Sequence, residues 1–250
     1  MVISAKQHQI VSAAISLGYL VVIQIFATPV PVFRFLIPAF IVYLLVVSGY
    51  NYFYLRTKVD VSFWQVIRMP LFLLSWFGLF LLVPSSILRG LFLLAGLPII
   101  FMLEIFIGRV GEQLLFNEVL LTAFGGYISL MAFYQYFQIT PVIYLFVVFS
   151  LSVLLCRTSY EMTPATNAGK WGGALVIGLF ITELFWALTF LPLHYSALGV
   201  IIFSCFYSVW ALYYYHLFNH LTKSKVQFHL ALSAVCIIVI SLITPWQIIN

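Results

Sequence analysis

The chain has 250 residues, of which 64% are hydrophobic and 7% are charged, and its formal net charge is +5. Soluble domains carry about 25% charged residues because water must solvate their surface, so this composition argues against a water-soluble globule. The basic residues are scattered without a cluster, which argues against a nucleic-acid-binding surface. We therefore expect lipid to cover most of the surface of the chain.

Nine stretches are apolar over enough residues, or nearly enough, to cross about 30 Å of hydrocarbon as helices of about 20 residues. In chain order they are residues 10–27, 35–54, 70–83, 91–107, 119–137, 142–156, 171–191, 196–218 and 228–248. The third and fourth are short and closely spaced, so they could instead be two halves of a re-entrant element. The sequence predicts an all-α, polytopic integral membrane helix bundle of about nine transmembrane helices, in which residues 1–250 form a single transmembrane domain without a soluble domain.

The basic residues predict the orientation of these spans, because cytoplasmic loops hold an excess of Lys and Arg. With the N-terminus inside, nine of the eleven basic residues fall on the cytoplasmic side, and only Arg34 and Arg89 fall outside. The nine are Lys6, Arg56, Lys58, Arg68, Arg109, Arg157, Lys170, Lys223 and Lys225. We expect a multi-pass protein of the cell membrane with its N-terminus inside and its C-terminus outside.

Motifs of familiar membrane enzymes are absent from the sequence. It contains no HExxH, and the Gly-Lys pair at 169–170 is followed by tryptophan, so there is no P-loop. The three cysteines, Cys156, Cys205 and Cys236, form no CxxC and predict neither a disulfide framework nor a zinc knuckle. We expect no cofactor, and the sequence favours a protein that is not an enzyme.

Glu183 is the first candidate for a functional site, because it lies about midway along the seventh predicted span, where an ionisable residue is costly. No Lys or Arg lies at a comparable depth, so we expect Glu183 to face the bundle interior, protonated or hydrogen-bonded. Matching depths across the spans nominates Ser204, Tyr207 and Ser208 of the eighth span and Tyr127 of the fifth as its neighbours. These residues are the candidate substrate- or ion-binding site.

The other carboxylates near span ends have simpler interpretations. Glu104 lies a few residues from the cytoplasmic end of the fourth span, so we expect it to snorkel to the membrane surface or to pair near Arg109. Glu112 and Glu118 open the fifth span, where carboxylates complement the helix dipole.

Three histidines form a second candidate site, for a metal. His216 and His220 are four residues apart, the spacing that puts two side chains on one face of a helix, and His229 follows on the same side of the membrane. An HxxxH pair alone is a weak signal, and histidines beside Lys223 and Lys225 also suit an interface with anionic lipid headgroups. We favour the lipid-facing interpretation and expect no bound metal.

Small residues predict where helices approach each other closely. Ala174, Gly178 and Thr182 repeat at four-residue spacing on the seventh span, and Gly125 and Ser129 do so on the fifth. Such ridges let two helix backbones pack tightly in a bilayer. We interpret them as packing faces within the chain.

Three functional hypotheses remain open. The first is a small permease or membrane-embedded substrate-binding subunit that uses Glu183 in a central cavity. The second is a non-catalytic scaffold subunit that holds other membrane proteins through its small-residue ridges. A more distant third is an intramembrane enzyme that uses the cytoplasmic-side histidines. Membrane lipids are the expected partners in all three, and no nucleic acid is expected.

The predicted topology can be tested with reporter fusions. A reporter fused after Ser224 and another fused at Asn250 should report opposite sides of the membrane, because one span lies between them. If both fusions report the same side, the predicted number of spans is wrong.

Overall fold

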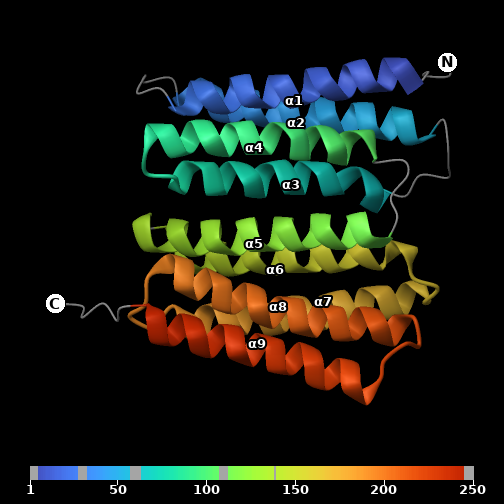
Figure 1. The fold of residues 1–250 in the computed structure, drawn as a ribbon, viewed down its shortest axis with the longest axis vertical. Helices are drawn as coiled ribbons and strands as arrows, with labels where there is room; N and C mark the ends of the chain where they lie inside the picture. Colours follow the sequence, from blue (N-terminus) through green and yellow to red (C-terminus); the bar gives the residue numbers. More distant parts are fainter. Residues whose placement is uncertain (1–4, 28–32, 57–62, 107–111, 138, 245–250) are drawn as a thin grey trace. The chain divides into compact units, whose positions relative to one another are not determined.

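The computed structural model describes residues 5–27, 33–56, 63–106, 112–137 and 139–244, and within these ranges it contains nine long α-helices and no strand (Figure 1). The helices are α1 (Ala5–Ala27), α2 (Phe33–Arg56), α3 (Phe63–Leu82), α4 (Ser86–Ile105), α5 (Glu112–Tyr136), α6 (Pro141–Ser159), α7 (Asn167–Leu188), α8 (Tyr195–Leu217) and α9 (Lys223–Ile243). A short 3₁₀ turn, η1 (Tyr160–Met162), follows α6.

All nine of these described helices are long and apolar enough to cross a membrane, which confirms the predicted all-α polytopic fold. The helices α3 and α4 have 20 residues each, so each is long enough to cross on its own, which argues against the alternative of one re-entrant element. At 1.5 Å per residue, each is about 30 Å long, which matches the hydrocarbon thickness.

The helices α3 and α4 begin earlier than predicted, for two different reasons. In α3, Arg68 is tolerated inside the helix because it is buried beside Glu118, with 3.9 Å between its Nε and the carboxylate Oε2. In α4, the side chain of Ser85 caps the helix by accepting a hydrogen bond of 3.1 Å from the main-chain N–H of Leu88. The cap satisfies a main-chain donor that hydrocarbon cannot satisfy.

The chain divides into two compact units, residues 1–118 and 119–250. In the first unit α1 packs against α2 and α4, and α3 packs against the same two helices, so the four form a bundle. Its core is aromatic, and Tyr19, Phe72 and Phe80 are almost fully buried. The Tyr19 hydroxyl donates a 2.6 Å hydrogen bond to the main-chain carbonyl of Leu73, which ties α1 to α3.

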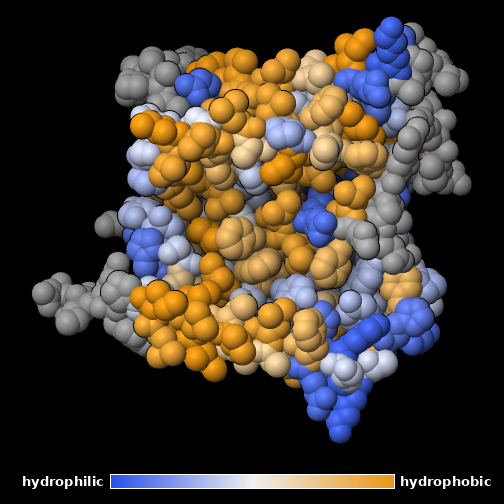
Figure 2. Space-filling view, in the orientation of Figure 1, coloured by the Kyte–Doolittle hydropathy of each residue, from blue (hydrophilic) through white to orange (hydrophobic). Residues whose placement is uncertain are grey.

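The second unit continues from Val119 in α5 and contains α6, η1, α7, α8 and α9. Successive helices pack side by side from α6 to α9. Trp210 of α8 is fully buried, and its indole N–H donates a 2.7 Å hydrogen bond to the hydroxyl of Ser159 at the end of α6. On the face shown in Figure 2, apolar residues cover most of α9 and hydrophilic residues gather where it begins.

Two glycines bring helices of the second unit into very close contact. A Cβ added at Gly178 would lie 2.5 Å from Cγ2 of Val153, and one added at Gly199 would lie 2.6 Å from the Cα of Ile128. Ala174 and Gly178 are buried, so the small residues predicted on the seventh span do form a packing face. These contacts hold α7 against α6, and α8 against α5.

The close approach at Gly199 predicts a large effect of one methyl group. Gly199→Ala should lower the free energy of unfolding by about 1–3 kcal/mol, because the nearest atom is main chain and cannot rotate away. Gly172→Ala is the matched control, since nothing lies within 4 Å of its added Cβ, and alanine should stabilise the helix slightly. Thermal unfolding in detergent measures both. Equal melting temperatures for the two variants would contradict the packing at Gly199.

Candidate functional site

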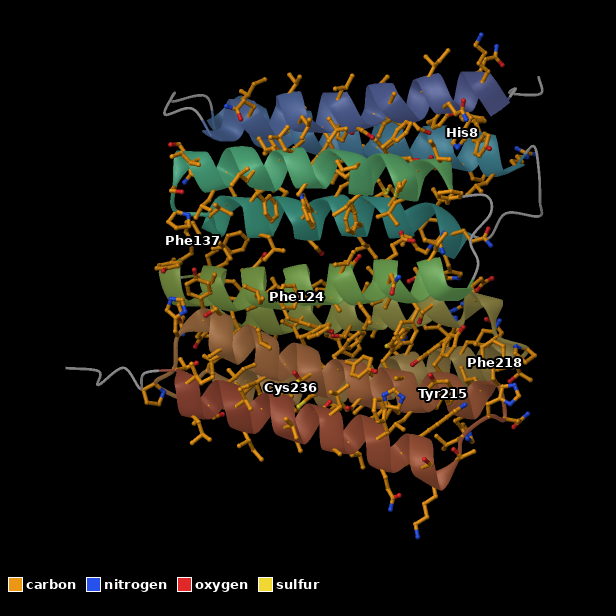
Figure 3. All side chains as sticks on the ribbon, in the orientation of Figure 1. His8, Phe124, Phe137, Tyr215, Phe218 and Cys236 are labelled. Atoms are coloured by element: carbon orange, nitrogen blue, oxygen red, sulfur yellow. The ribbon has the colours of Figure 1, made fainter. Side chains whose placement is uncertain are left out.

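Three polar residues from different helices meet near one end of the first unit. Because consecutive spans run in opposite directions, the start of α1 and the ends of α2 and α4 lie at the same end of this bundle. His8 lies in the first turns of α1 (Figure 3), Asn51 in the last turns of α2, and Glu104 in the last turn of α4. All three are buried, with exposed fractions of 3%, 0% and 0%.

Glu104 and Asn51 form the centre of this buried carboxyl site. The side-chain amide of Asn51 donates a 3.2 Å hydrogen bond to Oε1 of Glu104. The other oxygen of each group, Oε2 of Glu104 and Oδ1 of Asn51, is buried and accepts no hydrogen bond from the described part of the chain. A buried acceptor without a donor costs about 1–3 kcal/mol, so two such atoms in one contacting pair require a physical account.

His8 covers this pair from α1. Its Nε2 lies 3.1 Å from the main-chain carbonyl of Glu104, and its Nδ1 lies 2.8 Å from the hydroxyl of Tyr50. A carbonyl can only accept, so Nε2 carries the hydrogen, and a neutral ring then accepts from Tyr50 at Nδ1. The imidazole also stacks on the ring of Tyr54, with 3.6 Å between ring centroids and an angle of 10° between planes.

Other titratable groups of the first unit lie around Glu104. Tyr43 and Tyr50 of α2 and Glu118 of α5 interact with it electrostatically. Glu118 in turn lies beside Arg68 of α3, so the second carboxylate has a cationic neighbour and Glu104 has an amide. The positive charge of Arg68 therefore favours an ionised Glu118, whereas the neutral amide of Asn51 gives Glu104 no such compensation.

The arrangement suits a carboxylic acid better than a carboxylate. An ionised Glu104 would be a buried negative charge that receives one side-chain hydrogen bond, which is unfavourable away from water. A proton on Oε2 supplies the donor that Oδ1 of Asn51 lacks, so one added hydrogen can satisfy both unpaired oxygens. The site can therefore hold a proton, and it changes its hydrogen bonding when the proton leaves.

The structure places Glu183 differently from the prediction. Its side chain is exposed on the surface of α7, so the expectation that it faces the bundle interior is wrong. Ile181 and Phe185 are buried, and each is two residues away, a rotation of about 200° around the helix. The helix also spans Asn167–Leu188, so Glu183 lies five residues from its end rather than midway. Its role in substrate or ion binding stays a prediction.

The proposed neighbours of Glu183 bond to other helices. Ser208 shares a short hydroxyl hydrogen bond with Ser233 of α9, and its hydroxyl also contacts the main-chain carbonyl of His229 at 3.0 Å. The carbonyl of Ser204 accepts a 2.9 Å hydrogen bond from Ser233. These serines therefore join α8 to α9.

The two tyrosines proposed beside Glu183 also have other neighbours. The ring of Tyr207 packs edge-on against His229, with 5.3 Å between centroids. The hydroxyl of Tyr127 lies 2.8 Å from that of Ser152, which joins α5 to α6.

The three candidate metal ligands are not arranged on one helix face. The helix α8 ends at Leu217, and Asn219 has a φ of 55°, so His220 lies beyond the helix, which makes the one-face prediction wrong. His216 and His220 are exposed, whereas His229 is buried. Within the described residues, no three His, Cys, Asp or Glu side chains are grouped as metal ligands.

Sequence reasoning missed the buried carboxyl site because it treated Glu104 as an end residue. The expectation that Glu104 snorkels to the surface is wrong, since it is fully buried. Arg109, its other proposed partner, lies outside the described residues. A usable signal was present: His8, Asn51 and Glu104 each lie within a few residues of a span end on the same predicted side, so depth matching would have grouped them.

Comparison with known families matches one region of the chain. A family described as "Protein of unknown function (DUF5656)" matches residues 118–243, from the second turn of α5 to the last residue of α9. No curated protein and no solved structure matches the chain. The matched region corresponds to the second unit, and Glu104 lies before it.

Substitutions at Glu104 and Glu183 provide a direct test of the positions of these two side chains. Glu104→Leu should lower the free energy of unfolding by about 1–3 kcal/mol, because it leaves the buried amide of Asn51 without its acceptor. Glu183→Leu should leave stability unchanged, since its side chain is exposed on α7. Thermal unfolding of both variants in detergent measures the difference. A larger loss for Glu183→Leu would contradict the positions assigned to both residues.

Proposed function

Because this chain belongs to DUF5656, a family of proteins of unknown function, we propose from its own geometry that it is a small permease that binds a proton at Glu104. The proton would bind and leave as the permease moves a solute across the membrane. The proposal rests on one observation: Glu104 and Asn51 each keep a buried oxygen without a donor, although they are hydrogen-bonded to each other.

Proton binding accounts for both unsatisfied oxygens at once. In the protonated state, the O–H of Glu104 donates to the amide oxygen of Asn51 while the amide N–H donates to Oε1. In the ionised state that donor is lost, and a buried negative charge appears among apolar helices. The two states therefore favour different packing around Glu104, which is what a proton-coupled conformational change requires.

The position of Glu104 supports exchange of this proton with water. Glu104 is in the last turn of α4, which ends at Ile105, so the proton need not cross the full hydrocarbon to reach that end of the bundle. His8 joins three helices at this end, because it contacts Tyr50 and Tyr54 of α2 and the main-chain carbonyl of Glu104 in α4. A movement of α1 that breaks these contacts would remove His8 from the buried carboxyl site.

The scaffold hypothesis makes a different demand on the same residues. A scaffold needs Glu104 only as a neutral hydrogen-bonding group, and glutamine would serve that purpose at any pH. A permease of the proposed kind needs a group that gains and loses a proton, which glutamine cannot do. Replacement by glutamine therefore separates the two functions without removing the hydrogen bond to Asn51.

Transport currents test the proposal. Proteoliposomes adsorbed on a solid-supported membrane are exposed to concentration jumps of amino acids, sugars, organic acids and organic amines, at two pH values. We expect the wild-type protein to give a pH-dependent current with at least one of these classes, and Glu104→Gln to lower that current by at least tenfold. Glu183→Gln is the matched control and should keep the current, because Glu183 lies exposed on α7.

A second measurement detects the protonated state of Glu104 by infrared spectroscopy. Infrared difference spectra between high and low pH should contain the carbonyl stretch of a protonated carboxylic acid, and this band should disappear in Glu104→Gln and persist in Glu183→Gln. A wild-type protein that gives no current with any solute, and no carboxylic acid band that depends on Glu104, would overturn the proposal and favour a scaffold. A mild-detergent pull-down of membrane partners would then be the next experiment.

A further inference from the structure

We propose that the second unit binds one acyl chain of an anionic phospholipid in a groove between α7 and α8. This inference uses residues of the DUF5656-matched region and does not depend on Glu104 or on transport. The ligand class is set by two features of the groove: its walls are apolar, and the end of the unit at which it lies carries a net positive charge.

The groove has a volume of about 450 Å³ and is lined almost entirely by apolar side chains. Its lining includes Gly172 and Val176 of α7, and Val209, Leu212 and His216 of α8. The volume lies within the range of roughly 300–1,000 Å³ that is typical of small-molecule pockets. Val176 is 68% exposed and His216 is exposed, so the groove opens to the outside of the unit.

Two adjacent glycines create the space. At Gly173, an added Cβ would lie 2.0 Å from the ring of Tyr213, so this glycine is needed for the tyrosine to pack on α7. At Gly172, no atom lies within 4 Å of an added Cβ, so the position faces open space. Tyr213 is fixed further by a 2.9 Å hydrogen bond from its hydroxyl to the carbonyl of Gly169. The groove is therefore a fixed feature of the α7–α8 contact.

Charged residues of the second unit gather at the end where this groove lies. Arg157, Lys170, Lys223 and Lys225 are at that end, with Glu161 as the only carboxylate there among the described residues of the unit. Glu161 forms an ion pair with Arg157. Four positive charges against one negative charge leave this end with a net positive charge.

Lys170 lies on α7, the helix that forms one wall of the groove. It lies three residues before Gly173, a lining residue on the same side of α7, and its ammonium group donates a 3.0 Å hydrogen bond to the main-chain carbonyl of Glu161. A carbonyl oxygen does not neutralise the charge, and an ammonium group has two further N–H donors. The phosphate of a lipid whose acyl chain enters the groove would lie at the membrane surface beside this lysine.

The apolar groove and the basic residues at the same end of the unit together favour an anionic phospholipid over other occupants. An apolar groove that begins beside basic residues at the boundary of the hydrocarbon complements a molecule with an anionic head and an apolar chain. A neutral lipid would fill the groove without using the charge, and a helix of a partner protein would have to cover His216 and Lys170 as well. These occupants are outcomes that the experiment separates from the proposed one.

The test counts lipids that stay bound to the purified protein. The full chain is reconstituted into vesicles of equal phosphatidylglycerol and phosphatidylcholine, extracted in mild detergent and analysed by native mass spectrometry. We expect the wild-type protein to retain one phospholipid, with phosphatidylglycerol favoured at least fivefold. Gly172→Leu, whose side chain enters the groove, should lose this lipid, whereas Gly90→Leu should keep it, because Gly90 also has nothing within 4 Å of its Cβ but lies on α4.

Three further variants complete the test. If Gly172→Leu does not fold, Val176→Trp fills the same groove, and Leu179→Trp serves as its control on an exposed surface of α7 that does not line the groove. Lys170→Gln should retain a lipid but lower the preference for phosphatidylglycerol to less than twofold. Equal lipid retention by folded wild-type and groove-filled variants, or no preference for the anionic lipid in the wild type, would overturn the proposal.

Discussion

Hydrocarbon offers no hydrogen-bond partner, and this constraint governs most of the polar contacts in the structure. The buried indole N–H of Trp210 donates to the Ser159 hydroxyl, which donates in turn to the carbonyl of Cys156. Tyr19 donates to the main chain of α3. Some buried polar atoms of the described residues have no hydrogen-bond partner, and two of these atoms, Oε2 of Glu104 and Oδ1 of Asn51, belong to side chains that are hydrogen-bonded to each other. This pairing is why they mark a site and not merely a packing detail.

Close helix packing is the second source of order, and glycine makes it possible. In a bilayer the hydrophobic effect does not drive helices together, so van der Waals contact must hold them. Gly178 and Gly199 let neighbouring helices meet at distances that any side chain would prevent. Gly173 does the same for the ring of Tyr213, and this contact leaves the α7–α8 groove beside it. Gly173 therefore allows the close packing, and the adjacent Gly172 faces the open space of the groove.

The fold could be predicted from the sequence to a large extent, whereas the burial of the site residues could not. Hydropathy locates each span because apolar length is a local property, but it places helix ends poorly where a partner changes the environment. Arg68 made the third stretch appear short, since its neutralisation by Glu118 depends on a residue 50 positions later in the sequence. Thr166 likewise starts α7 before the apolar run begins, by accepting a hydrogen bond from Gly169.

Site prediction failed for a related reason. The burial of a polar side chain depends on which way its helix face points, and the sequence of one helix does not state this. Glu183 follows Thr182 within a mostly apolar helix, yet it lies opposite the buried face defined by Ile181 and Phe185. Glu104 lies close to a helix end, yet it points toward Asn51 and is fully buried. The depth of Glu104 could be estimated from its distance to the span end, but its rotation about the helix axis could not.

The uneven distribution of charge in the second unit has a consequence for how the chain enters the membrane. The connections at residues 137–140 and 189–194 contain no Asp, Glu, Lys or Arg. Moving one elementary charge through a potential of 100 mV requires about 2.3 kcal/mol of electrical work. Because neither connection carries such a charge, translocation of either one during biosynthesis would require no work against the membrane voltage.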